Sequence, residues 1–225
     1  MKTEKEAWNK VKDFMADRSI ELGGHWSYNL YNDPKRLVFV LSRYKFAAKM
    51  AAKNKTVLEL GCSEGIGAPI LSEFAAGYTG VDLDGDAIAA AKRNWASEKV
   101  DFIAGDFLDK KYGSFDSVVS LDVVEHIDRK SEALFFRALV NNLKTDGVAV
   151  VGTPNAAAAR YASAASRLGH VNLFDAERLR STMKKYFKTV MMFGSNDEII
   201  HTGFLPMAHY LICLGFGKRL KGGRS

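Results

Sequence analysis

Three glycines, Gly61, Gly65 and Gly67, follow an apolar run and precede a helical pattern in the segment VLELGCSEGIG. Glycine allows such a turn to adopt positive φ angles and lets the backbone approach a ligand closely. A dinucleotide-binding fingerprint spaces its glycines G-x-G-x-x-G, but Ser63 occupies the second glycine position here. The close approach that a pyrophosphate needs is therefore not provided.

Two aspartates end further apolar runs. Asp82 ends the run YTGVD, 21 residues after Gly61, where a carboxylate can accept two hydrogen bonds from ribose hydroxyls. Asp106 follows the run DFIAG. Taken singly, each acid is more often a helix cap. Together, at the carboxyl ends of successive parallel strands, they favour a ligand site, because open α/β sheets bind ligands at that edge.

The elements that must position these residues alternate between apolar runs and helical patterns. Five apolar runs separated by helices predict right-handed βαβ units and a parallel sheet covered on both faces. Two later runs, KTVMMFG and MAHYLICLGF, predict an antiparallel pair of strands near the C-terminus. The fold class expected is therefore α/β, with a doubly wound, mostly parallel sheet of seven strands.

The chain of 225 residues suits one domain with three parts. We expect an N-terminal helical cap over residues 1–54, a ligand-binding α/β core over residues 55–155, and an acceptor-side segment with the terminal strands over residues 156–225. Within the cap, helical patterns over residues 2–17 and 34–52 predict helices packed over the open end of the sheet.

Composition excludes several classes. Apolar residues make up 47% and charged residues 26%, which excludes disordered and low-complexity chains. Cys62 and Cys213 are too far apart to suggest a disulfide framework or a metal-binding pair, so a reducing compartment is expected. No apolar run approaches the length needed to span a bilayer, and the N-terminal segment MKTEKEAWNKVKDF mixes acids with bases where a signal peptide has an apolar core. The expected location is cytoplasmic.

Charge is distributed unevenly along the chain. Residues 1–55 hold 12 basic and 6 acidic residues, residues 56–159 hold 9 and 16, and residues 160–225 hold 11 and 4. An acidic centre between basic flanks does not predict the continuous basic face that nucleic acid requires. It would suit a small anionic ligand held between the flanks, although ordinary solvated helix faces would give the same counts.

In their order, these motifs resemble the class I S-adenosylmethionine-dependent methyltransferases over roughly residues 55–155. The glycine turn, with Glu59 before it, resembles motif I of that family. The later segment FDSVVSLDVVEHI resembles the fourth-strand motif, and its ending, Glu125-His126-Ile127, is typical of the branch that includes ubiquinone and menaquinone-type O-methyltransferases. The resemblance implies a Rossmann-like fold, S-adenosyl-L-methionine as cofactor and S-adenosyl-L-homocysteine as product.

The resemblance also implies where the cofactor binds. Asp82 would bind the ribose, and Asp106 would contact the adenine amino group. A side chain added at Gly65 is expected to push into the tail of the cofactor. The full set of implied cofactor-binding residues comprises the turn and the strand ends: Glu59, Gly61, Cys62, Ser63, Gly65, Asp82, Leu83, Asp106, Phe107 and Leu121.

The methyl acceptor is less well defined. Leu121-Asp122-Val123-Val124 stands where base-modifying aminomethyltransferases carry Asp or Asn, two prolines and an aromatic residue, so DNA and protein-amide methylation are not expected. The resemblance places Thr153, Asn155 and His170 above the methyl group, with residues 201–204 as a further wall. A small-molecule oxygen is expected, and sugars, nucleotide-linked sugars and phenolic metabolites all stay open.

The histidines that could act as general base are His126, His170 and His201. His126 is predicted, with His170 as its main competitor, because Asp122 and Glu125 are near enough in sequence to orient His126. His25 and His209 lie farther from any motif. Asp122, Glu125 and His126 could instead hold a divalent cation, but the set is one carboxylate short, and no metal is predicted.

Two alternatives come from other functional classes. A nicotinamide-dependent oxidoreductase would share the sheet and the ribose acid. A non-catalytic nucleoside-binding module would keep the nucleoside pocket and lack an acceptor site. The sequence leaves the oligomeric state open.

Overall fold

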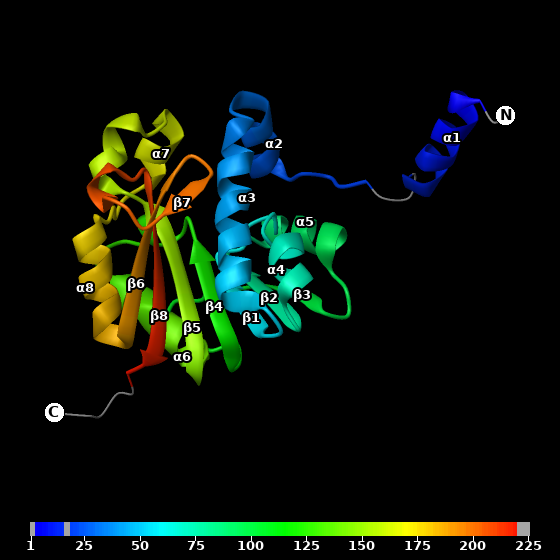
Figure 1. The fold of residues 1–225 in the computed structure, drawn as a ribbon. Helices are drawn as coiled ribbons and strands as arrows, with labels where there is room; N and C mark the ends of the chain where they lie inside the picture. The colour runs from blue at the N-terminus through cyan, green and yellow to red at the C-terminus, as the bar shows by residue number, and fades with distance from the viewer. Residues whose placement is uncertain (1–2, 16–18, 220–225) are drawn as a thin grey trace.

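The computed structural model describes residues 3–15 and 19–219. Its centre is an eight-stranded sheet in the order β3-β2-β1-β4-β5-β8-β6-β7 (Figure 1). Strands β1 to β5 pair in parallel, which confirms the predicted doubly wound core. These five strands are β1 (Thr56–Leu60), β2 (Gly77–Asp82), β3 (Val100–Ala104), β4 (Phe115–Leu121) and β5 (Leu143–Pro154).

The two predicted late strands are β6 (Phe187–Asn196) and β8 (Tyr210–Lys218), and they are antiparallel as expected. Strand β8 lies between β5 and β6. The sheet has one strand more than predicted, because β7 (Ile199–His201) pairs with the end of β6. A strand of three residues is too short to leave a recognisable alternating pattern in the sequence.

Helices cover both faces of the sheet. One apolar cluster includes Val57 and packs beneath α3 (Lys35–Ala47), the π-helical turn η1 (Ala48–Ala52), α4 (Ala68–Phe74) and α5 (Gly85–Trp95). The other includes Leu58 and Leu60 and packs beneath α6 (Glu132–Asn142) and α8 (Ala176–Tyr186). Burial of both faces requires β1 to be a nearly continuous apolar run.

Side-chain caps set where two of these helices begin. The Asp84 carboxylate accepts hydrogen bonds from the amides of Asp86 and Ala87 at the start of α5. The Asp175 carboxylate accepts one from the Arg178 amide at the start of α8. Each cap satisfies backbone N–H groups that have no partner within the helix.

The N-terminal helices differ from expectation. Helix α1 (Glu4–Met15) falls within the predicted helix over residues 2–17, of which residues 2, 16 and 17 lie outside the described part. It buries none of its residues, and Figure 1 shows it apart from the sheet, so its predicted packing is wrong. Helix α2 (Gly24–Asn32) does pack, through the buried Trp26.

Short elements after β4, β5 and β7 complete the edge where the parallel strands end. They are the 3₁₀ turns η2 (Val124–His126), η3 (Ala156–Tyr161) and η4 (Leu205–Met207), and helix α7 (Ala164–Gly169). Within the described ranges, no helix has both the length and the apolar character needed to cross a bilayer.

Candidate active site

The glycine turn after β1 has the backbone that its sequence suggests. Gly61 and Gly65 have φ angles of +81° and +74°, and Ser63 between them has +48°. A Cβ atom on Gly61 would lie 2.3 Å from Cγ2 of Val123. Glycine is therefore required at position 61 both for its φ angle and for space. The turn lies beside the switch point between β1 and β4, where strand order reverses.

Asp82 stands at the end of β2 and holds the turn in place. Its Oδ2 accepts a hydrogen bond from the Ser63 amide at 2.7 Å, and its Oδ1 accepts one from the Asp84 amide at 3.0 Å. An ionised carboxylate has about four acceptor positions, so each oxygen keeps one more. The half-buried Asp82 can therefore support the turn and still accept two ribose hydroxyls.

Leu83 and Asp106 extend the ligand-facing edge from Asp82. Leu83 is 73% exposed and offers an apolar surface beside Asp82. Asp106 is exposed after β3, and its Oδ1 accepts a hydrogen bond from the Leu108 amide at 2.8 Å. An apolar side chain next to two carboxylates fits an adenosine, which has a flat apolar ring and polar hydroxyl and amino groups.

Other implied cofactor residues lie in the interior. Cys62, Phe107 and Leu121 are 1%, 7% and 3% exposed and pack in the apolar clusters, so their side chains offer a ligand almost no surface. Gly65 is also buried, and a Cβ atom there would meet Ala91, Trp95 and Phe102 at about 3 Å. The expectation that such a side chain would point into the cofactor is therefore corrected, because this position faces the core.

Glu59 is fully buried beneath the turn. Its two carboxylate oxygens accept hydrogen bonds from the hydroxyls of Tyr44 and Tyr78, at 2.6 and 2.5 Å. Burial raises the pKa of Glu59 to about 7, although the two hydroxyls act in the opposite direction. The expectation that Glu59 contacts the cofactor is therefore corrected: its side chain links α3 to β1 and β2 and supports the turn from below.

Glu59→Gln is expected to remove a pH-dependent loss of stability. The folded state holds the Glu59 proton up to about pH 7, whereas the unfolded chain releases it near pH 4.5, so this contribution to the free energy of unfolding falls as pH rises between those values. Between about pH 5 and about pH 8, the free energy of unfolding of the wild type should fall by roughly 1–3 kcal/mol relative to that of Glu59→Gln.

Urea denaturation of both proteins at the two pH values measures this change. The exposed Glu73→Gln is the matched control and should show no comparable change with pH. Parallel pH profiles for wild type and Glu59→Gln would contradict the buried, protonated state.

Glu64 joins the cap to the turn, a contact that the sequence did not indicate. Its carboxylate accepts hydrogen bonds from the amides of His25 and Trp26 at 2.9 and 3.0 Å, at the start of α2. Glu64 is itself buried. The cap is therefore held directly on the loop that follows β1, and His25 is brought near a motif from which the sequence separated it.

A cavity of about 350 Å³ lies over the ends of β4 and β5. Helix α3 and the segment from η3 to α7 form its two sides, and the Arg36 guanidinium reaches the Ser166 hydroxyl across them at 3.4 Å. Its lining residues include Asp33, Arg36, Phe39, Arg43, Asp122, Asn155, Tyr161, Ser166, Arg167, His170, His209 and Tyr210. His209 therefore lies at the cavity, although in the sequence it is far from any motif.

Asp122 has a different partner from the one expected. Both of its carboxylate oxygens lie 3.2 Å from Nη1 of Arg43, and the Arg43 guanidinium stacks over the Tyr210 ring at 3.5 Å. Asp122 also has a φ of +57°. The expected orientation of His126 by Asp122 is not observed, because the Asp122 carboxylate is paired with Arg43 on α3.

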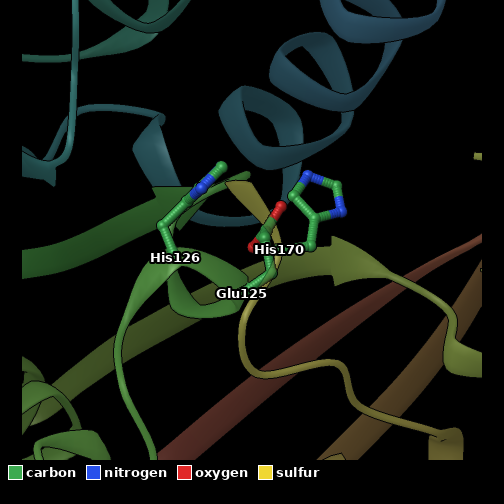
Figure 2. Close-up of side chains that lie close together, drawn as sticks. All are labelled: Glu125, His126 and His170. Carbon is green, nitrogen blue, oxygen red and sulfur yellow. The ribbon is translucent and has the colours of Figure 1, made fainter. Parts of the chain in front are cut away.

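Three titratable side chains meet beside the cavity, as Figure 2 shows for Glu125, His126 and His170. One ligand atom from each lies within 4.8 Å of the others, close enough for the three side chains to hold one divalent cation. The sequence considered Asp122 in such a set, and His170 takes its place. The prediction that no metal binds stays a prediction.

Within this group, burial differs sharply. Glu125 is fully buried; its Oε2 accepts a hydrogen bond from the Thr153 hydroxyl at 3.0 Å, while its Oε1 has no partner. Burial, and then the nearby Asp122, raise the pKa of Glu125 well above its ordinary value. A protonated Glu125 is thus favoured beside the two imidazoles.

The two histidines contact each other edge to face, with ring centroids 5.0 Å apart. His126 is exposed, and its Nδ1 lies 2.9 Å from the Gly169 carbonyl oxygen. His170 is half-buried and lines the cavity. Burial, and then the neighbouring His126, lower the pKa of His170, which favours the neutral imidazole that a base requires.

Two further expectations for the acceptor side need correction. The Thr153 hydroxyl is buried against Glu125, and the Asn155 amide donates to the carbonyls of Leu205 and Ala208, so these groups serve the fold. Residues 201–204 are not among those that line the cavity. His209 and Tyr210 supply that wall instead.

Comparisons with known proteins identify the family of the chain. A family model described as a methyltransferase domain matches residues 33–186, which is more than half of the chain. A probable S-adenosylmethionine-dependent methyltransferase of Mycolicibacterium smegmatis is 32% identical over 104 residues, covering 45% of this chain and 39% of that protein. A ubiquinone biosynthesis O-methyltransferase of Xanthomonas campestris is 28% identical over 137 residues, covering 59% of this chain and 54% of that protein.

The matched segments thus span about half or less of these curated relatives. Among solved structures, a possible histamine N-methyltransferase from Thermotoga maritima superposes with a TM-score of 0.68 at 16% identity, over 86% of this chain and 95% of that one. At this identity the likeness shows the fold alone.

Proposed function

The chain belongs to the S-adenosylmethionine-dependent methyltransferases, and from this premise we propose that it methylates an oxygen of a small molecule. The observation that carries the proposal is the cavity of about 350 Å³ over the ends of β4 and β5, next to the strand ends that would bind the cofactor. Asp122, just after β4, lines this cavity. The glycine turn that Asp82 holds in place follows the adjacent strand β1. The similarity to a ubiquinone biosynthesis O-methyltransferase supports oxygen as the acceptor atom.

We also propose that the three parts of the chain act as one unit. Residues 55–155 hold the cofactor, while the cap and the acceptor-side segment close the cavity from opposite sides. Two kinds of hydrogen bond support this division: Glu64 accepts from two backbone amides of α2, and Arg36 donates to Ser166. Such closure excludes water and aligns the acceptor, which lowers the barrier to a displacement reaction.

S-adenosyl-L-methionine supplies an electrophilic methyl group on a sulfonium ion. We propose that His170 accepts the proton that the acceptor hydroxyl loses as its oxygen–carbon bond forms. His126 then acts as a positioning residue through its contact with the His170 ring. This reverses the preference for His126 that the sequence suggested, because His170 is the one that lines the cavity.

Transfer of a radiolabelled methyl group to a panel of sugars, nucleotide-linked sugars and phenols tests the proposal. Matched amines, in which the hydroxyl is replaced by an amino group, serve as controls. Label on oxygen is the expected result. Label on the amines alone would contradict oxygen as the acceptor, and binding of S-adenosylhomocysteine without turnover on any compound would favour the nucleoside-binding module.

A further inference from the structure

The cavity contains an uneven set of charges. Three arginines, Arg36, Arg43 and Arg167, face two aspartates, Asp33 and Asp122. Arg43 and Asp122 neutralise each other through their ion pair. The remaining side chains leave the cavity with an excess of positive charge.

Neither Arg36 nor Arg167 forms an ion pair within residues 3–15 and 19–219. Arg36 reaches only the Ser166 hydroxyl, and Arg167 donates to the Ala162 carbonyl at 2.5 Å. Arg36 is also half-buried, so part of its hydration is lost without an ion-pair partner among the described residues. An anion that entered the cavity would remove this cost.

The two arginines approach from opposite sides of the cavity. Arg36 lies in the first turn of α3, and Arg167 lies on α7. Guanidinium groups present several N–H donors in a planar fork, which suits the paired oxygens of a carboxylate or phosphate. The Ser166 hydroxyl accepts the hydrogen bond from Arg36 and lies 2.9 Å from the Ser163 hydroxyl, so it holds the Arg36 guanidinium on the α7 side of the cavity.

We propose that Arg36 and Arg167, with Ser166, form a subsite for an acidic group on the methyl acceptor, either a carboxylate or a phosphate. This inference rests on the proposed function, because it assigns the class of acceptor to the same cavity. The rings of Phe39 and Tyr161 supply apolar walls for the body of that acceptor. Asp33 also faces the cavity, and its charge favours a group with one negative charge over one with two.

Titration of three small probes into the protein saturated with S-adenosylhomocysteine tests the subsite. Benzoate carries a carboxylate, phenyl phosphate carries a phosphate, and benzyl alcohol is neutral with a similar ring. At fixed ionic strength, at least one anion should bind at least about tenfold more tightly than benzyl alcohol. The ratio of the two anion affinities identifies which acidic group the subsite prefers.

Arg36→Gln should weaken binding of the preferred anion at least about tenfold, and Arg36→Gln combined with Arg167→Gln should remove its advantage over benzyl alcohol. Lys35→Gln is the matched control, because Lys35 is exposed on the same helix and loses the same charge. Affinity for S-adenosylhomocysteine should stay unchanged in all variants, which shows that they fold.

Equal affinity for the anions and benzyl alcohol, or equal anion affinity in wild type and Arg36→Gln, would overturn the subsite. Failure of the wild-type protein to bind S-adenosylhomocysteine would instead contradict the proposed function. The anion titration would then be repeated without it, and the same comparisons would decide for or against the subsite.

Discussion

Asp82→Ala is expected to weaken binding of S-adenosylhomocysteine at least about tenfold, because each charged hydrogen bond that it removes from a ribose hydroxyl contributes roughly 1.5–3 kcal/mol. Its carboxylate has an acceptor position left on each oxygen for a ribose hydroxyl. The same carboxylate fixes the Ser63 amide at 2.7 Å, so the variant also frees the turn that it supports. Calorimetric titration measures the affinity directly.

Asp84→Asn is the matched control for this change. It removes the same charge two residues away and keeps an oxygen that can cap α5. Its affinity for S-adenosylhomocysteine should match that of the wild type within about threefold. An Asp82→Ala protein that binds as tightly as wild type would show that the ribose lies elsewhere.

His170→Ala should lower kcat by about 10²–10⁴-fold, the contribution expected of a positioned general base. Affinity for S-adenosylhomocysteine should change little, because a base acts on the acceptor proton in the transition state. Burial lowers the pKa of His170 from 6.5, so in the wild type kcat should rise with pH through a value below 6.5 and then level off. Steady-state kinetics with an acceptor from the panel provide both measurements.

His126→Ala separates a positioning role from a catalytic one. His126 contributes to the lowered pKa of His170, so its removal should move the acidic limb of the kcat profile toward pH 6.5. The loss in kcat should be smaller than for His170→Ala. If kcat falls further in His126→Ala than in His170→Ala, the two roles are reversed. If both variants retain the wild-type kcat, the enzyme works by alignment without a histidine base.

The α/β core could be predicted because its evidence is local. Buried parallel strands need nearly continuous apolar runs, and β1 shows this directly, because Val57, Leu58 and Leu60 are buried around Glu59. The glycine turn and the acids at the strand ends are likewise defined by their spacing along the chain. Asp82 could therefore be singled out before its hydrogen bonds were known.

The acceptor side could not be predicted in the same way, because it depends on contacts between distant residues. Arg43 meets Asp122 across 79 positions, and Trp26 meets Glu64 across 38. Which side chain faces a cavity depends on such contacts, so His170 could not be ranked above His126. The support role of Glu59 was hidden for the same reason, since its partner Tyr44 belongs to the cap.

A crystal structure of the protein with S-adenosylhomocysteine tests the central claim most directly. The claim is that the cavity between α3 and α7 receives the methyl acceptor. The ribose should lie on Asp82, and the sulfur atom should face the cavity on the side of His170. A sulfur atom directed away from this cavity, toward open solvent or another part of the surface, would contradict the account.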